Sequence, residues 1–129
     1  MNHYNHMDRL SDAKVISEVE SNEKLVASIT GRDPEYFRFP AGNYNQHDLE
    51  LVNKMGLKVV HWTYASGDPD KNIKAPALEN EINTMTKPGD ILIFHINGRG
   101  WSTGQALPQI IIELKAKGYS FVRLEDVVH

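Results

Sequence analysis

Apolar residues recur at helical spacing in four separate stretches of this chain. Within each stretch most of them fall three or four residues apart, which places them on one face of a helix. Glycines at positions 31, 56 and 118 follow three of the stretches, where the end of a helix favours a left-handed residue. The predicted helices run from near Leu10 to Gly31, from Asn43 or Asn45 to Gly56, over Leu78–Met85, and from Thr103 to Gly118.

Short continuous apolar runs lie between these helices and are typical of buried strands. The first run, Tyr36–Phe39, is flanked by prolines, and a proline ends a strand because it cannot donate a ladder hydrogen bond. The later runs are Leu57–Tyr64, Ile91–Phe94 and Ser120–Leu124. Strands that alternate with helices predict a parallel sheet covered by helices, so the expected fold class is α/β.

Composition narrows the possible classes of protein. The 129 residues, 40% of them hydrophobic, suit one domain, which we predict over residues 1–129. A net charge of −3 offers no broad basic surface, so we expect no nucleic-acid partner. No apolar run approaches the roughly 20 residues that span a bilayer, so we expect no membrane span. Met1–His6 has no apolar signal region, and the compartment stays open.

Three polar residues follow predicted strands and form the leading candidate site. Arg38 closes the first strand, Asp68 follows the second by a few residues, and His95 comes directly after Ile91–Phe94. Because the carboxyl ends of parallel strands share one edge, we expect these side chains around a common pocket. An imidazole beside a carboxylate can act as a general acid or base near neutral pH. A structural, hydrogen-bonded histidine is the alternative, but the neighbouring arginine and aspartate favour catalysis.

The remaining histidines offer a second kind of chemistry. His3 and His6 are nitrogen donors close enough in sequence to bind one divalent ion, although a zinc site needs a third ligand from elsewhere. The alternative is an unstructured polar terminus. We expect His47 in the first turn of a helix, His61 in a strand and His129 at the terminus, all structural or exposed.

The two tryptophans are expected to differ in role. Trp62 lies in a predicted strand and is expected in the core. Trp101 follows the loop Gly98–Gly100 and is the candidate for stacking on a ligand, with surface packing as the alternative. The loop glycines do not form a phosphate loop, because no Lys-Ser/Thr ending follows them.

Several segments together match the motifs of one enzyme family. Phe37–Gly42 is similar to its arginine-proline motif, Val59–Asp70 to its tryptophan and aspartate motif, Pro88–His95 to its apolar-x-His motif, and Asn2–Asp8 to its metal-binding histidine motif. Trp101–Pro108 and Gly118–Leu124 continue like its following helix and closing strand. Nearly the whole chain thus resembles the carboxyl-terminal portion of a polysaccharide deacetylase, the NodB homology domain of carbohydrate esterase family 4.

The resemblance implies a fold and a reaction. The fold would be a partial (β/α) barrel with parallel strands, truncated on its N-terminal side. The reaction would remove N-acetyl, or sometimes O-acetyl, groups from a carbohydrate polymer with a divalent metal, usually zinc, polarising the acetyl carbonyl. His3 and His6 would be metal ligands, and the acetylated carbohydrate would be the partner.

The resemblance also assigns roles to single residues. His95 would protonate the departing amine, and Arg38 would orient the base aspartate. Asp68 falls on the second aspartate of its motif, whereas Ala65 stands where the first is common. Pro40–Ala41 lie where the oxyanion binds, with the backbone N–H of Ala41 as donor.

The chain departs from the family pattern in two places. The first family motif, Thr-Phe-Asp-Asp, supplies the base and one metal ligand, and no such segment occurs here. His3 and His6 are separated by Tyr4 and Asn5 alone, whereas the family places three residues between its histidines, so weak or absent metal binding is expected. Missing leading strands would leave a sheet edge open, and we therefore expect a homo-oligomer.

Two functions of different class stay open. One is a metal-dependent deacetylase, a hydrolase of non-peptide C–N bonds, and the other is an inactive, deacetylase-like remnant that self-associates or binds sugar. General-base catalysis is typically worth about 10²–10⁴-fold, so the missing aspartate leaves open whether this chain turns over substrate. A small nucleotide-binding domain ranks last, because the chain has no phosphate loop.

Overall fold

The computed structural model describes residues 3–128, and the chain divides into two compact units. The first unit comprises residues 1–61 and the second residues 62–129. The single domain expected over residues 1–129 stays a prediction. His129 lies outside the described residues.

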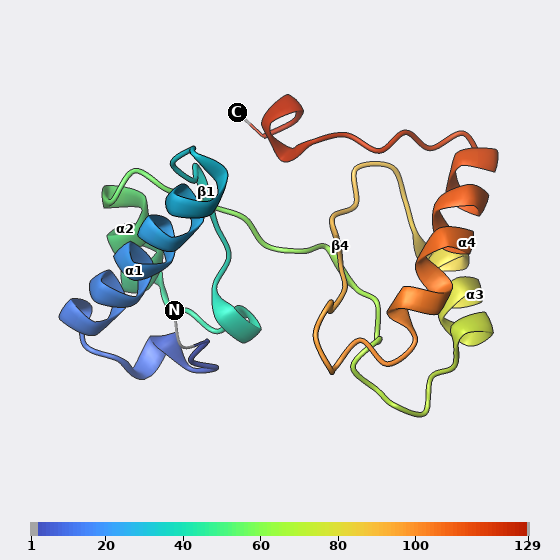
Figure 1. Ribbon diagram of the computed structural model, residues 1–129, viewed down its shortest axis with the longest axis horizontal. Helices are drawn as coiled ribbons and strands as arrows, with labels where there is room; N and C mark the ends of the chain where they lie inside the picture. The colour runs from blue at the N-terminus through green and yellow to red at the C-terminus, as the bar shows by residue number, and fades with distance from the viewer. Residues whose placement is uncertain (1–2, 129) are drawn as a thin grey trace. The chain divides into compact units, whose positions relative to one another are not determined.

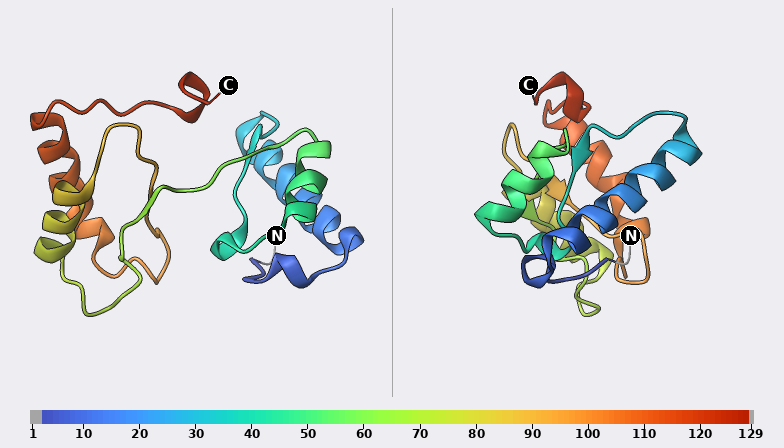
Figure 2. Two further views of the ribbon diagram at one scale, coloured as in Figure 1. Left: turned by 180° about the vertical axis from the view of Figure 1, so that it is seen from behind. Right: turned by 90° about the vertical axis from the view of Figure 1, so that its left-hand side faces the viewer.

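The first unit contains two helices and a two-stranded parallel sheet. Its elements are α1 (Asp12–Thr30), β1 (Tyr36–Phe37), α2 (Gln46–Lys54) and β2 (Lys58–Val59). β1 and β2 pair in parallel, with Tyr36 opposite Lys58. α1 and α2 lie side by side in both views (Figure 1, Figure 2). α2 therefore lies between β1 and β2 along the chain, as the alternating pattern predicts.

Local signals set the ends of these two helices. Gly31 ends α1 in the left-handed conformation at φ 71°, and its N–H donates to the carbonyl of Ala27. Asn45 caps α2 through a reciprocal capping box: its side chain accepts from the N–H of Asp48 at 2.9 Å, and the Asp48 carboxylate accepts from the N–H of Asn45 at 3.0 Å. Of the two asparagines left open by the sequence, Asn45 is the cap.

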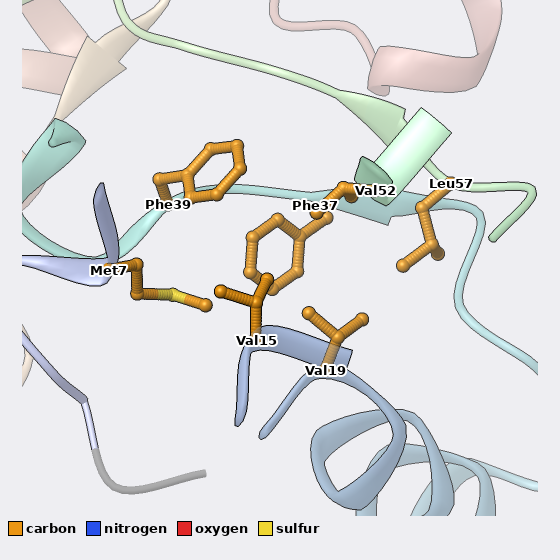
Figure 3. Packing of buried hydrophobic residues seen from close by; sticks show 7 residues of the cluster. All are labelled: Met7, Val15, Val19, Phe37, Phe39, Val52 and Leu57. Carbon is orange, nitrogen blue, oxygen red and sulfur yellow. The ribbon is translucent and has the colours of Figure 1, made fainter. Parts of the chain in front are cut away.

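The core of the first unit is partly aromatic (Figure 3). Its buried residues, each at most 5% exposed, are Met7, Val15, Val19, Phe37, Phe39, Val52 and Leu57. The rings of Phe37 and Phe39 meet edge to face with centroids 5.1 Å apart. Burying a side chain of this size contributes about 1.5–3 kcal/mol, so these contacts hold the segment after β1 against α1.

The second unit repeats the scheme with an aliphatic core. Its elements are β3 (Tyr64–Ala65), α3 (Ala75–Met85), β4 (Leu92–Ile93) and α4 (Thr103–Ala116). β3 and β4 pair in parallel, with Ala65 opposite Ile93. α3 and α4 pack side by side (Figure 1, Figure 2). The buried cluster consists of Ala75, Leu78, Ile82, Ala106, Ile110 and Leu114.

The four helices and the parallel α/β class are confirmed, but two predicted strands are wrong. Residues 57–64 do not form one strand: β2 pairs with β1, β3 pairs with β4, and residues 60–63 between them are irregular. The chain changes partner at Thr63, whose hydroxyl donates to Asp90 at 2.8 Å and accepts from the N–H of Ile91. His61 therefore lies outside a strand, and Trp62 is only partly buried.

The predicted closing strand at residues 120–124 is also absent. Residues 119–123 are irregular and lead into a 3₁₀ turn at Leu124–Asp126. A strand needs a neighbour for its ladder hydrogen bonds, and no described strand pairs with this segment. Phe121 and Val122 are accordingly 54% and 61% exposed. Among residues 3–128, none of the helices has the length and apolar character needed to cross a membrane.

Candidate active site

The ends of β3 and β4 bring Asp68 and His95 into contact. His95 lies two residues after β4, and Asp68 lies three residues after β3. Because the strands are parallel neighbours, these side chains emerge at the same edge. His95 Nδ1 lies 2.8 Å from Asp68 Oδ1, and the backbone N–H of His95 donates to Asp68 Oδ2 at 2.6 Å. Two separate groups of one residue thus bind the two oxygens of the same carboxylate.

Two hydroxyls complete the hydrogen bonding of Asp68, whose side chain is fully buried. Thr103 Oγ1 donates to Oδ2 at 2.5 Å, and Ser66 Oγ donates to Oδ1 at 2.9 Å. Gly67 adopts φ 78°, a left-handed conformation, and this turn brings Ser66 and Asp68 together. Each carboxylate oxygen therefore accepts from two donors, which satisfies a buried charge.

These contacts decide the charge of Asp68. Burial alone would raise the pKa of this carboxyl group, but the hydrogen bonds from Thr103, from the backbone and ring of His95, and from Ser66 together lower its pKa below the ordinary value. Asp68 is therefore ionised at neutral pH. A carboxylate only accepts hydrogen bonds, so the Nδ1 of His95 carries the proton between them.

The ring of His95 is placed to exchange a proton through its other nitrogen. Its side chain is 29% exposed, whereas its carboxylate partner is buried. With Nδ1 occupied by Asp68, Nε2 is the nitrogen that can give a proton to, or take one from, a bound molecule. The resemblance implies an aspartate at the position of Ala65, yet His95 has a carboxylate partner in Asp68.

In the loop from His95 to α4, the backbone of Gly100 lies against the backbone of His95. The N–H of Gly100 donates to the carbonyl of Asn97 at 2.9 Å, and a Cβ at Gly100 would overlap the carbonyl oxygen of His95. Only glycine therefore fits this close backbone approach. The same loop exposes Ile96 completely and leaves Trp101 63% exposed. Trp101 is thus a surface side chain, and its role in stacking on a ligand stays a prediction.

The first unit holds the other sequence-predicted residues. Arg38 follows β1 and is exposed, Pro40 is buried, and Ala41 adopts φ 53°. A left-handed alanine costs on the order of 1–2 kcal/mol, and such strain concentrates at functional sites. Phe39, stacked on Tyr44 with centroids 4.9 Å apart, holds this turn in place. Arg38, Pro40 and Ala41 belong to a different unit from Asp68 and His95, so the expected common pocket stays a prediction.

The expected metal ligands are also in the first unit. His3 and His6 are both exposed, and His6 Nδ1 lies 3.5 Å from the carboxylate of Asp8. Within residues 3–128 the structure shows no group of three or more His, Cys, Asp or Glu side chains that could hold a metal ion. Among the described residues His3 and His6 are therefore part of no complete set of ligands, and their role as metal ligands stays a prediction.

Two further histidines, His47 and His61, contact neighbouring side chains of the first unit. His47 lies in the first turn of α2, as expected, and its Nε2 pairs with the exposed Asp12 at 2.9 Å. The ring of His61 lies edge on to Tyr44 at 6.0 Å between centroids. Both side chains are exposed, in agreement with the sequence analysis.

Sequence reasoning did not identify Ser66 and Thr103 as partners of Asp68. Ser66 precedes the aspartate by two residues, a spacing at which a hydroxyl often binds a neighbouring polar group. Thr103 is 35 positions from Asp68 and was expected only to begin a helix. The spacing of Ser66 could have indicated its contact, whereas only the fold reveals that of Thr103.

Comparison with known proteins identifies the family that this chain resembles. A family model described as polysaccharide deacetylase matches residues 1–60. Over 92% of its length the chain is 31% identical to a chitooligosaccharide deacetylase from Azorhizobium caulinodans, and the match covers 61% of that protein. The chain belongs to the polysaccharide deacetylase family. It spans little more than half the length of such a relative.

Solved structures of this family show the same fold. A peptidoglycan N-acetylglucosamine deacetylase superposes with a TM-score of 0.89 at 24% identity, over 97% of this chain and 58% of the other. A family 4 pseudoenzyme from Bacillus anthracis superposes with a TM-score of 0.87 at 20% identity, over 99% and 44%. At these identities the likeness concerns the fold alone. The expected fold class, part of a NodB-type (β/α) barrel, is confirmed.

Proposed function

We propose that this polysaccharide deacetylase family member takes part in hydrolysis of N-acetyl or O-acetyl groups on a carbohydrate polymer, with His95 as its proton-transfer residue. The observation that carries the proposal is the His95–Asp68 contact at 2.8 Å, with the carboxylate buried and the ring partly exposed. The names of the relatives support the substrate class, since one acts on chitooligosaccharides and another on peptidoglycan N-acetylglucosamine.

The proposed step is protonation of the leaving group. Water forms a bond to the acetyl carbon and gives up one proton to a base, which would have to come from outside this sequence. The bond from that carbon to nitrogen then breaks, acetate is released, and the nitrogen leaves as an amine after taking a proton. His95 gives that proton from Nε2 while its Nδ1–H remains bound to Asp68. The ionised carboxylate stabilises the charged ring before transfer, and such general-acid catalysis is typically worth about 10²–10⁴-fold.

The remaining proposed roles belong to residues of both units. Arg38 would orient a base aspartate, which the family motif missing from this sequence would have to supply. Pro40–Ala41 present a backbone N–H to the oxyanion, and the left-handed backbone of Ala41 supports this role. Trp101, on the exposed loop of the second unit, stacks on a sugar ring. The roles of Arg38, Pro40 and Ala41 follow from the family resemblance, whereas that of Trp101 follows from its exposed place in the loop.

A divalent metal, with zinc as the first choice, is part of the proposal through His3 and His6. Because residues 3–128 contain only an incomplete ligand set, the remaining ligands would come from outside them. Zinc titration followed by calorimetry measures this directly: weak binding that His3→Ala abolishes is expected, and binding unchanged by that variant contradicts the assignment.

A second candidate function is a non-catalytic sugar-binding or self-associating protein. The specific observation in its favour is the incomplete metal-ligand set of the described residues. The fold likewise occurs in a protein described as a family 4 pseudoenzyme. Each described strand pairs with one neighbour, and unpaired edges favour association with another chain. Sedimentation velocity at rising concentration tests this: a growing dimer fraction supports it, and a monomer throughout contradicts it.

Acetate release separates the two functions. The full chain, supplied with zinc, is incubated with N-acetylglucosamine oligomers, and released acetate is measured enzymatically. Release that falls about 10²–10⁴-fold in His95→Ala is expected from loss of the general acid. His47→Ala is the matched control, because His47 is an exposed histidine paired only with Asp12 in the contacts described above. No release by the wild-type chain overturns the enzymatic proposal and favours the second candidate.

A further inference from the structure

The carboxylate of Asp68 is fixed in its plane by donors on both oxygens. Oδ2 accepts from Thr103 Oγ1 at 2.5 Å and from the backbone N–H of His95 at 2.6 Å. Oδ1 accepts from Ser66 Oγ at 2.9 Å and faces the ring of His95. Rotation of the carboxylate about its Cβ–Cγ bond would break these hydrogen bonds inside a buried site, where unpaired polar groups are costly.

The hydroxyl of Thr103 binds a residue outside the helix that Thr103 begins. Hydroxyls at the start of a helix commonly accept hydrogen bonds from the backbone N–H groups of that helix. Thr103 is the first residue of α4, yet its hydroxyl donates to Asp68. The preceding Ser102 makes no side-chain cap either, and its hydroxyl donates to the carbonyl of Ile73 at 2.7 Å. Both hydroxyls therefore serve contacts outside α4.

We propose that Thr103 and Ser66 are positioning residues for the His95–Asp68 pair. Their hydroxyls hold the carboxylate in the plane in which Oδ1 meets Nδ1 of His95. The neutral ring is thereby kept in the tautomer that carries its proton on Nδ1, and Nε2 becomes the nitrogen that takes up and releases protons. The catalytic meaning of this inference rests on the proposed function, whereas the positioning is a property of the chain without substrate.

The tautomer of His95 is measurable by long-range proton–nitrogen NMR of the isotope-labelled full chain, at a pH where the ring is neutral. His95→Gln identifies the signals of this ring among those of the other histidines. The wild-type ring is expected to carry its proton on Nδ1. Thr103→Val removes the hydroxyl at nearly constant volume, and the ring is expected to shift toward a mixture with the Nε2–H form. Thr103→Ser restores a hydroxyl and is expected to restore the wild-type signals.

Thr86→Val is the matched control, because the hydroxyl of Thr86 donates to the backbone carbonyl of Ile82 and not to Asp68. Its His95 signals are expected to equal those of the wild type. An unchanged tautomer in Thr103→Val, or a wild-type ring with its proton on Nε2, overturns the inference. If circular dichroism shows that Thr103→Val does not fold, Ser66→Ala carries the same expectation, and an unchanged ring there overturns it.

The NMR result is independent of turnover. A wild-type chain that releases no acetate would overturn the proposed function and leave the tautomer result standing. If the chain releases acetate but the tautomer of the His95 ring is the same in wild type, Thr103→Val and Ser66→Ala, the positioning inference alone is overturned.

Discussion

The two units bury carboxylates in different ways. In the first unit, Glu18 pairs with Lys14 four residues away, and Asp48 forms a capping box with Asn45 three residues away. In the second unit, Asp68 is bound by residues two, 27 and 35 positions away. The Asp48 carboxylate is bound within the first turn of its own helix, whereas the Asp68 carboxylate joins a strand end, a loop and the start of α4.

The difference indicates which buried charge is part of a site. A carboxylate bound by near neighbours stabilises the local structure that supplies those neighbours. A carboxylate bound by distant elements is satisfied only when the tertiary structure has formed, and it fixes the groups around it. Asp68 is of the second kind, and the group it fixes is a partly exposed imidazole.

Removal of the Asp68 carboxylate, whose partners are far away in sequence, is expected to have the largest effect on stability. Asp68→Ala leaves the hydroxyls of Thr103 and Ser66 and the N–H of His95 without their acceptor in a buried site. An unsatisfied buried donor costs about 1–3 kcal/mol, so a loss of roughly 3 kcal/mol or more in the free energy of unfolding is expected. Urea unfolding measures it, and a loss below about 1 kcal/mol would show that these donors find other partners.

Acid should remove the contribution of Asp68 to stability. Because its pKa is lowered in the folded chain, this group stabilises the fold fully above its ordinary pKa of 3.8, and the contribution is lost as the pH falls through the lower, folded pKa. The difference in unfolding free energy between wild type and Asp68→Asn should therefore shrink on acidification below 3.8. A difference that stays constant down to the acid limit of folding would contradict the lowered pKa.

Loss of the capping box between Asn45 and Asp48 is expected to lower the free energy of unfolding less than loss of the Asp68 carboxylate. Asn45→Ala breaks the capping box and is expected to cost about 1 kcal/mol of unfolding free energy. Ser11→Ala is the matched control, because Ser11 stands at the same position before α1 but makes no side-chain cap. Equal losses in the two variants would mean that the capping box adds nothing.

The same contrast explains what could be predicted from sequence. His95 and Asp68 were expected together because both follow strands, and the parallel pairing of β3 with β4 follows from helices alternating with apolar runs. The change of strand partner at Thr63 could not be predicted, because residues 57–64 are rich in β-branched and aromatic residues and no local signal marks the break. The contact of Thr103 with Asp68 joins residues far apart in sequence, so only the packed structure defines it.

The central claim, that His95 and Asp68 act as one proton-transfer unit, is tested most directly by a double-mutant comparison of acetate release. His95→Ala, Asp68→Asn and the double variant are assayed on N-acetylglucosamine oligomers. Because residues that act as a unit have non-additive effects, the double variant is expected to lose no more activity than His95→Ala alone. Losses that multiply in the double variant, or full activity in His95→Ala, would contradict the claim.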